Sequence, residues 1–399
     1  MINPAPSQDH SAGAPAAGRV PGWLATGLWA MGGYAAVRLL GLVVLAVAGR
    51  AAGRPLLDLL TNWDGGWYLG IAEHGYDTSI SYADDGHLRN TNIAFFPLFP
   101  WLIRALGVLG VSGPVAAVVI ANLAGLVAAW GIALVGARFG GHRVGLLLAV
   151  LWGALPHAVV QSMAYTESLF TALAAWALWA VLGRRWVLAG VLAAVAGLAR
   201  PTAVAIVAAV VVACVVEIVQ HRRRAGTAPW LGALLAPTGY VGYLAWCAVR
   251  LHRPDAYFWM QDKGWTSRVD FGVTTLRELA RTATHVRQPA LIVTSVVIVL
   301  AVVAFALLVR DTLRRRWPVE VMVPLLVFAG LVLLTTLVQG GPFFYAKGRF
   351  LLPAFPLLLP AAVALAGARP AVRWGTVAVL AGFSAWYGQY LLLVWFLSP

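Results

Sequence analysis

The sequence has little charge for its length. Charged residues make up 11% of the 399-residue chain, whereas about a quarter is usual for a soluble globular domain. Hydrophobic residues make up 61%, and the mean hydropathy is +0.80. Apolar runs long enough to cross about 30 Å of hydrocarbon recur along the whole chain. The composition therefore predicts an all-α polytopic membrane protein, with the lipid bilayer as its surroundings.

Cysteine and lysine are also scarce. The two cysteines, Cys214 and Cys247, both fall inside apolar segments, where they act as small core residues rather than as a disulfide or a metal pair. The two lysines are Lys263 and Lys347. No paired His or Cys spacing typical of a metal site occurs, and no glycine-rich loop opens a helix. We therefore expect no structural metal and no bound nucleotide.

The positive charge is carried by arginines, and the net charge is +14. Such a charge could indicate a protein that binds nucleic acid, but the arginines form short clusters between apolar runs. That placement is typical of cytoplasmic loops facing anionic lipid, so no nucleic-acid partner is expected. The clusters are Arg138/Arg143, Arg184/Arg185, Arg222-Arg223-Arg224, Arg310/Arg314-Arg315-Arg316 and Arg369/Arg373.

Placing every cluster in the cytoplasm fixes the predicted topology. Residues 1–22 form a disordered cytoplasmic tail, and residues 23–397 form a single transmembrane domain of about eleven helices. Residues 49–113 become the first extracytoplasmic loop and residues 251–288 the second large one. Within the first loop, residues 93–111 carry two prolines and an arginine, so we expect an interfacial or re-entrant segment. The alternative, a true span there, would put five basic clusters outside.

The first loop contains an acid among aromatic residues. Asp64 lies between Trp63, Trp67 and Tyr68, and aromatic side chains of this kind favour the membrane–water boundary. On a helix, Asp64 and Tyr68 share one face. The stretch predicts a short amphipathic helix that carries one carboxylate at the membrane surface. That carboxylate is either a functional acid or an ordinary helix N-cap.

Further polar residues fall on the same predicted face of the membrane. A carboxylate and several cations at one boundary suit chemistry on a phosphate-bearing lipid. Each also has a plainer interpretation, such as a first-turn acid, a packing histidine, a snorkelling arginine or an interfacial anchor. The residues are His157, Tyr165, Glu167, Arg200, Lys347 and Arg349.

Several of these stretches, in order, resemble the GPI mannosyltransferase 2 family (phosphatidylinositol-glycan class V). The resemblance runs from about residue 30 to about residue 355. In the first loop it rests on Trp63-Asp64, Tyr68, Ile71-Ala72, Gly75-Tyr76 and Phe95-Phe96-Pro97-Leu98-Phe99-Pro100. Later in the chain it rests on Tyr165-Thr166-Glu167-Ser168-Leu169-Phe170, Ala199-Arg200 and Lys347-Gly348-Arg349-Phe350.

The resemblance implies a GT-C glycosyltransferase, a polytopic enzyme that uses a polyprenyl-phosphate sugar outside the cytoplasm. In that superfamily an acid of the first extracytoplasmic loop is the expected catalytic base, and Asp64 takes its place. The heavy use of Ala and Arg with almost no lysine indicates a GC-rich bacterial genome. We therefore expect a bacterial plasma-membrane protein with a cytoplasmic N-terminus and an extracytoplasmic site. The family's eukaryotic acceptor does not carry over.

The resulting hypothesis is an inverting transferase that moves a hexose, most readily mannose, to an extracytoplasmic lipid or glycan acceptor. Asp64 would deprotonate the acceptor hydroxyl, while cations neutralise the leaving phosphate. No cofactor is required, and a divalent metal is optional because fixed cations meet the phosphate. The substrate-binding residues we predict are Trp63, Tyr68, His157, Tyr165, Glu167, Arg200, Lys347 and Arg349.

Two other functions fit the same composition. A lipid-linked-sugar transporter or flippase would need polar residues along a path through the bilayer, whereas this sequence collects them at one face. A non-catalytic subunit of a glycosylation complex would tolerate the loss of Asp64.

Overall fold

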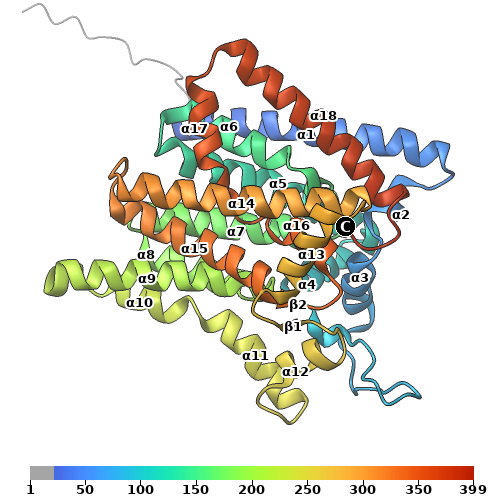
Figure 1. The fold of residues 1–399 in the computed structure, drawn as a ribbon. Coiled ribbons are helices and arrows are strands. Elements are labelled where there is room, and N and C mark those ends of the chain that lie inside the picture. Colours follow the sequence, from blue (N-terminus) through green and yellow to red (C-terminus); the bar gives the residue numbers. More distant parts are fainter. Residues whose placement is uncertain (1–21) are drawn as a thin grey trace, which may run out of the picture.

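The computed structural model describes residues 22–399, which form helices and one two-stranded sheet (Figure 1). The predicted disordered tail, apart from Gly22, lies outside the described residues. Within them, seven helices are long and apolar enough to cross a membrane. They are α1 (Gly22–Ala51), α5 (Gly113–Ala137), α9 with its leading turn η3 (Pro201–His221), the continuous pair α10 and α11 (Ala228–Arg250), α14 (Pro289–Leu313), α15 (Val319–Val338) and α18 (Pro370–Leu393).

Two further apolar segments are sharply bent. Helix α6 (Gly141–Gly153) and η2 (Pro156–Ser162) meet at 86°, and the segments Phe344–Phe350 (η5 and α16) and Phe355–Gly367 (η6 and α17) meet at 79°. Counting each bent pair as one span gives nine. The all-α polytopic class is thus confirmed, but the count of eleven is not exact. The remaining two predicted spans correspond to α7 (Glu167–Leu182) and α8 (Trp186–Ala196), which are shorter than the usual 20 or so residues.

The first loop folds into short elements rather than a span. After α2 (Leu56–Leu60), α3 (Asp64–His74) and η1 (Asn92–Ala94) comes α4 (Leu98–Val108). Eleven residues rise about 16 Å, roughly half the hydrocarbon thickness. Helix α4 packs on α3 and α5 through an apolar cluster that includes Tyr68, Phe99 and Ile103. Helix α4 is thus too short to cross unaided, and its interfacial placement stays a prediction.

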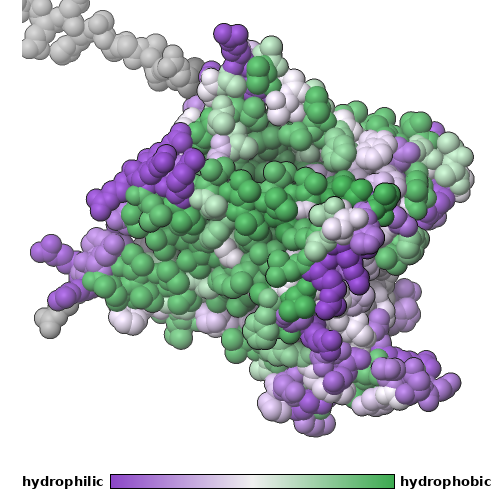
Figure 2. Space-filling model, in the orientation of Figure 1, coloured by the Kyte–Doolittle hydropathy of each residue, from purple (hydrophilic) through white to green (hydrophobic). Residues whose placement is uncertain are grey.

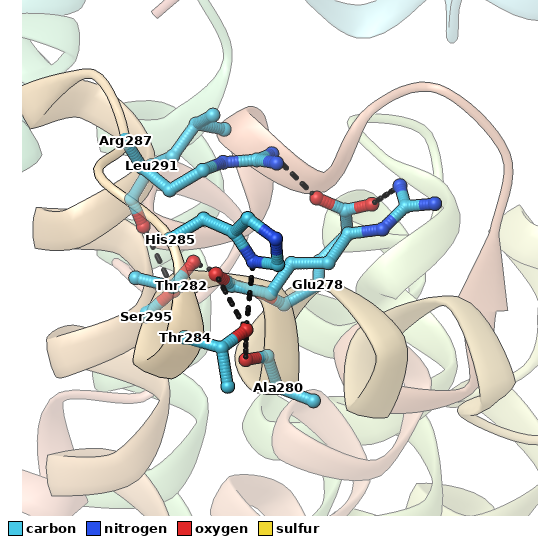
Figure 3. Close-up of polar contacts among 9 residues, drawn as sticks. Glu278, Ala280, Thr282, Thr284, His285, Arg287, Leu291 and Ser295 are labelled. Atoms are coloured by element: carbon cyan, nitrogen blue, oxygen red, sulfur yellow. Dashed lines mark hydrogen bonds and ion pairs between the residues drawn. The ribbon is translucent and has the colours of Figure 1, made fainter.

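The second large loop is anchored at both ends. It contains α12 (Ala256–Lys263), β1 (Arg268–Val269) and α13 (Val273–Thr284), and β1 pairs antiparallel with β2 (Gln339–Gly340), which follows α15. At the joint with α14, the Glu278 carboxylate accepts from Arg281 at 2.8 Å and from Arg287 at 2.7 Å (Figure 3). The strand pairing ties the loop to the end of α15. The hydroxyl of Ser295 in α14 donates to the Thr282 hydroxyl of α13 at 3.2 Å and ties the loop to α14.

The surface agrees with a membrane protein. Figure 2 shows a broad hydrophobic area over α14, α15 and α9, with hydrophilic residues at the α14–α15 turn and around the loops at the lower right. The turns of residues 222–227 and 314–318 lie at the left of Figure 1, whereas α3, α13 and the strands lie at the right. Basic turns and loop elements therefore occupy different ends of the helices.

The bends are stabilised by side chains that satisfy the interrupted backbone, because hydrocarbon offers no hydrogen-bond partners. Gln161 donates to the Trp152 carbonyl at 2.9 Å, and Ser384 donates to the Leu155 carbonyl at 2.7 Å. The Trp152 indole N–H donates to the Leu352 carbonyl at 3.0 Å, which lies in the other bend. The first broken segment thus helps to satisfy the backbone of the second.

His157 fills the space between the two bent segments. Its ring is buried and packs edge-on against Tyr387 with centroids 5.2 Å apart. Gly348 of α16 lies directly against this ring, so that a Cβ at position 348 would overlap the imidazole. The glycine is therefore needed for close approach rather than for backbone freedom.

We expect Gly348→Ala to destabilise the protein by about 1–3 kcal/mol through overpacking. Thermal unfolding of the purified protein measures this. Gly375→Ala is the matched control, because nothing lies within 4 Å of a Cβ there. Adding His157→Ala to Gly348→Ala should restore part of the lost stability. Equal melting of Gly348→Ala and wild type would contradict this packing.

Candidate active site

A cavity of about 170 Å³ lies where the first loop, the second large loop, the start of α7 and the second bent segment converge. Its walls come from residues widely separated in sequence, including α3, the start of α7, the α8–α9 connection and α16. The predicted site residues that line it are Asp64, Tyr68, Tyr165, Glu167, Arg200 and Arg349. The structure thus brings together six of the nine.

Asp64 is the first residue of α3 and not its N-cap. The N-cap is Trp63, and its side chain makes no capping hydrogen bond. The Trp63 backbone has φ of 52° and ψ of −114°, a strained conformation for a residue other than glycine. The Asp64 backbone N–H donates to the Tyr165 hydroxyl at 3.3 Å. The Trp63 ring packs in an apolar cluster outside the cavity lining. Trp63 therefore fixes the backbone that presents Asp64, instead of lining the site as predicted.

The Asp64 carboxylate is oriented by Arg349. Arg349 Nη2 lies 2.8 Å from Asp64 Oδ2 in an ion pair, and the two side chains are 7% and 27% exposed. The guanidinium also lies over the rings of Tyr165 and Phe350, at 5.0 and 5.1 Å from their centroids. Among the described residues, Asp64 Oδ1 has no hydrogen-bond partner. One carboxylate oxygen is held in place and the other is available.

A second acid–arginine pair lies in the same cavity. Arg200 Nη1 is 2.6 Å from Glu167 Oε1, with side chains 10% and 3% exposed. Arg200 precedes Pro201, which disfavours helix at the preceding residue, and its backbone is extended between α8 and α9. The break in the chain thus delivers Arg200 to the cavity, where it pairs with Glu167 rather than snorkelling to the headgroups.

Thr166 connects this second pair to the first loop. Its hydroxyl accepts from Arg200 Nη1 at 3.4 Å and shares a hydrogen bond of 3.3 Å with the Tyr68 hydroxyl. Burial raises the pKa of Tyr68 well above its usual value. Tyr68 is therefore neutral and serves as a hydrogen-bonding group, not as an acid or base.

Lys347 does not face the cavity, contrary to the sequence-based prediction. Its ammonium donates to the Thr275 hydroxyl at 2.7 Å and to the carbonyls of Thr336 and Gln339 at 2.6 and 2.5 Å. An ammonium has three N–H groups, so these partners use all of them. Lys347 instead ties α13 to the end of α15.

His157 is likewise outside the lining, because it packs between the bent segments. Sequence analysis also missed cavity residues that come from loops. In the sequence, these residues are marked only by being polar and by lying near the ends of apolar runs. The spacing of residues along the chain does not show that the loops converge in space. The missed residues include Thr166, Gln261, Trp265, Ser267 and Gln339.

Among residues 22–399, no group of three or more His, Cys, Asp or Glu side chains is arranged to hold a metal ion. The absence of a cofactor remains a prediction.

Comparison with solved structures places the fold. ArnT from Cupriavidus metallidurans bound to undecaprenyl phosphate aligns with a TM-score of 0.54 at 18% identity, over 87% of this chain and 61% of that one. The Archaeoglobus fulgidus oligosaccharyltransferase in the apo form aligns with a TM-score of 0.50 at 12% identity, over 90% of this chain and 55% of that one. The fold is similar to that of GT-C membrane glycosyltransferases.

This chain therefore spans about three fifths of the length of those proteins. No protein-family model matches the sequence, and no curated protein matches it significantly. The two alignments confirm the overall fold that the resemblance implies. Membership of the GT-C superfamily stays a prediction. Membership of the GPI mannosyltransferase 2 family, and a bacterial source, stay predictions.

The burial of the Glu167–Arg200 pair predicts a particular pattern of stability. Arg200→Met leaves the Glu167 carboxylate buried without its partner, which typically costs about 3–5 kcal/mol. The double variant Glu167→Leu with Arg200→Met removes both charges and should be more stable than Arg200→Met alone. Thermal or denaturant unfolding of wild type, Arg200→Met, Glu167→Leu and the double variant measures this. A double variant that is less stable than either single variant would contradict the paired burial.

Proposed function

We propose that this protein is a membrane glycosyltransferase that moves a sugar from a polyprenyl phosphate to an acceptor hydroxyl. The observation that carries the proposal is the pair of acid–arginine contacts, Asp64–Arg349 and Glu167–Arg200, in one cavity of a GT-C fold. An acid can accept a proton, and arginines can neutralise a leaving phosphate. The similar ArnT structure holds undecaprenyl phosphate, which supports a lipid phosphate as the leaving group.

The proposed reaction is a single displacement with inversion. The acceptor oxygen attacks the anomeric carbon while Asp64 Oδ1, which has no protein partner among the described residues, takes the hydroxyl proton. The bond between the anomeric carbon and the phosphate oxygen breaks, and its electron pair leaves with the polyprenyl phosphate. General-base help of this kind typically accelerates a reaction about 10²–10⁴-fold.

The arginines suit the leaving group. Nε and Nη1 of Arg349 and Nε of Arg200 are buried without a hydrogen-bond partner among the described residues. Buried donors normally have partners, and phosphate oxygens would supply them. Arg349 would then both orient Asp64 and contact the phosphate.

We propose mannose as the transferred sugar, supported by the resemblance to mannosyltransferases.

We also propose that the cavity opens on the extracytoplasmic side of a bacterial plasma membrane, with the N-terminus of the domain in the cytoplasm. The basic turns at the other end of the helices support this orientation, because arginine-rich loops favour the cytoplasm.

The test is sugar transfer by protein purified into lipid vesicles. Undecaprenyl phosphates bearing labelled mannose or glucose serve as donors, with a crude glycolipid extract as acceptor. We expect Asp64→Asn to lower the rate about 10²–10⁴-fold. Glu73→Gln is the matched control, because that acid lies on the same helix but is 76% exposed. Equal rates for Asp64→Asn and wild type would remove Asp64 as the base, and no turnover of any donor would contradict the function.

We further propose that transfer needs no divalent metal, because two arginines already face the phosphate site. Treatment of the purified protein with EDTA, followed by gel filtration, should leave the rate unchanged. A loss of activity that Mg²⁺ or Mn²⁺ restores would overturn this part of the proposal.

A further inference from the structure

One wall of the cavity has no acid and no cation. Gln261, Trp265 and Ser267 lie at the end of α12 and in the connection to β1, and Gln339 begins β2. Tyr257 of α12 joins them, and burial raises its pKa well above the usual value, so that it is neutral. The ion pairs, by contrast, come from α3, α7, α16 and the α8–α9 connection. The cavity is therefore divided into a charged part and a neutral part.

Each glutamine in the neutral wall is held at one end. Gln261 Nε2 donates to the Tyr257 hydroxyl at 3.1 Å, and Gln339 Nε2 donates to the Ser267 hydroxyl at 2.8 Å. Among the described residues, the other end of each amide has no side-chain or backbone partner. A carboxamide offers both donors and acceptors. Two oriented amides with free ends are suited to hydroxyl groups, which also donate and accept.

The aromatic part of the wall is equally fixed. The Trp265 indole N–H donates to the Thr91 carbonyl at 3.3 Å. Its ring packs edge-on against Phe95 and Trp67, with centroids 5.4 and 5.3 Å away. Aromatic faces carry negative charge density and attract positively polarised C–H groups. A rigid indole beside two amides thus matches a ring that bears C–H groups on its faces and hydroxyls at its edge.

Buried contacts hold this wall in position. Val269 of β1 pairs with Gln339 of β2, and the Lys347 ammonium donates to the Gln339 carbonyl and to Thr275 of α13. The Asp270 carboxylate accepts from the backbone of Gly272 and Thr274. Strand pairing and hydrogen bonds therefore hold the wall in one position.

We propose that this neutral wall, Gln261, Trp265, Ser267 and Gln339, is the acceptor subsite and that the acceptor presents an uncharged sugar ring to it. The inference rests on the proposed function and adds the acceptor class. A phosphate or carboxylate on that ring would find no cation in the wall. The acceptor hydroxyl would approach from the neutral wall, while the donor phosphate lies at the arginines.

The test separates acceptor binding from donor chemistry. With the labelled donor that wild type uses, we measure transfer to n-octyl α-D-mannopyranoside or n-octyl β-D-glucopyranoside, and hydrolysis of the donor without acceptor. Gln339→Leu and Trp265→Leu should each raise the acceptor KM about five-fold or more, as expected for one lost hydrogen bond or ring contact. Donor hydrolysis should stay within about two-fold of wild type, which also shows that the variants fold.

Gln288→Leu is the matched control, because that glutamine is exposed at the start of α14 and does not line the cavity. It should leave the acceptor KM unchanged. The 6-phosphate of octyl mannoside should be a poorer acceptor than octyl mannoside itself.

Three results would overturn the inference while the proposed function survives. They are unchanged acceptor KM values in both wall variants, a preference for the phosphorylated sugar, or donor hydrolysis with no transfer to either octyl glycoside. If wild type consumes no polyprenyl-phosphate sugar at all, the proposed function fails and the acceptor assignment fails with it.

Discussion

A backbone that breaks inside a membrane must find its hydrogen-bond partners within the protein, and this requirement shapes the whole site. The two bent segments meet at the Trp152–Leu352 hydrogen bond, and Gln161 and Ser384 satisfy two carbonyls of the first bend. Straight helices would carry the chain past the cavity. The bends instead leave Glu167 at the start of α7 and Arg349 within α16 at the same depth as the first loop.

Ion pairs then join parts of the chain that are distant in sequence. Asp64–Arg349 links the first loop to the second bend, and Glu167–Arg200 links the start of α7 to the α8–α9 connection. Burying charges is costly, and a pair stripped of one partner is costlier still. Such contacts add little to stability relative to apolar packing, so their presence at one cavity points to function. The strained backbone at Trp63, directly before Asp64, fits the same interpretation.

The sequence predicted the helical class well, because long apolar runs with few charges have one structural solution in lipid. It also singled out Asp64, Glu167, Arg200 and Arg349, since charged groups beside apolar runs are expensive and rarely incidental. It did not show that the Lys347 ammonium points away from the cavity, because a pattern of residue types does not reveal which carbonyls will surround it. It could not find the neutral wall, because the pairing of two short strands that brings Gln339 beside the second large loop leaves no signal in the sequence.

The most direct test of the central claim is an experimental structure of the protein with a polyprenyl-phosphate sugar bound. The account predicts the phosphate within hydrogen-bonding distance of Arg349 or Arg200, and the anomeric carbon facing Asp64. The donor sugar should leave the wall of Gln261, Trp265 and Gln339 free for the acceptor. A phosphate bound instead at the opposite end of the helices, in the second cavity beside His142 and Arg143, would contradict it.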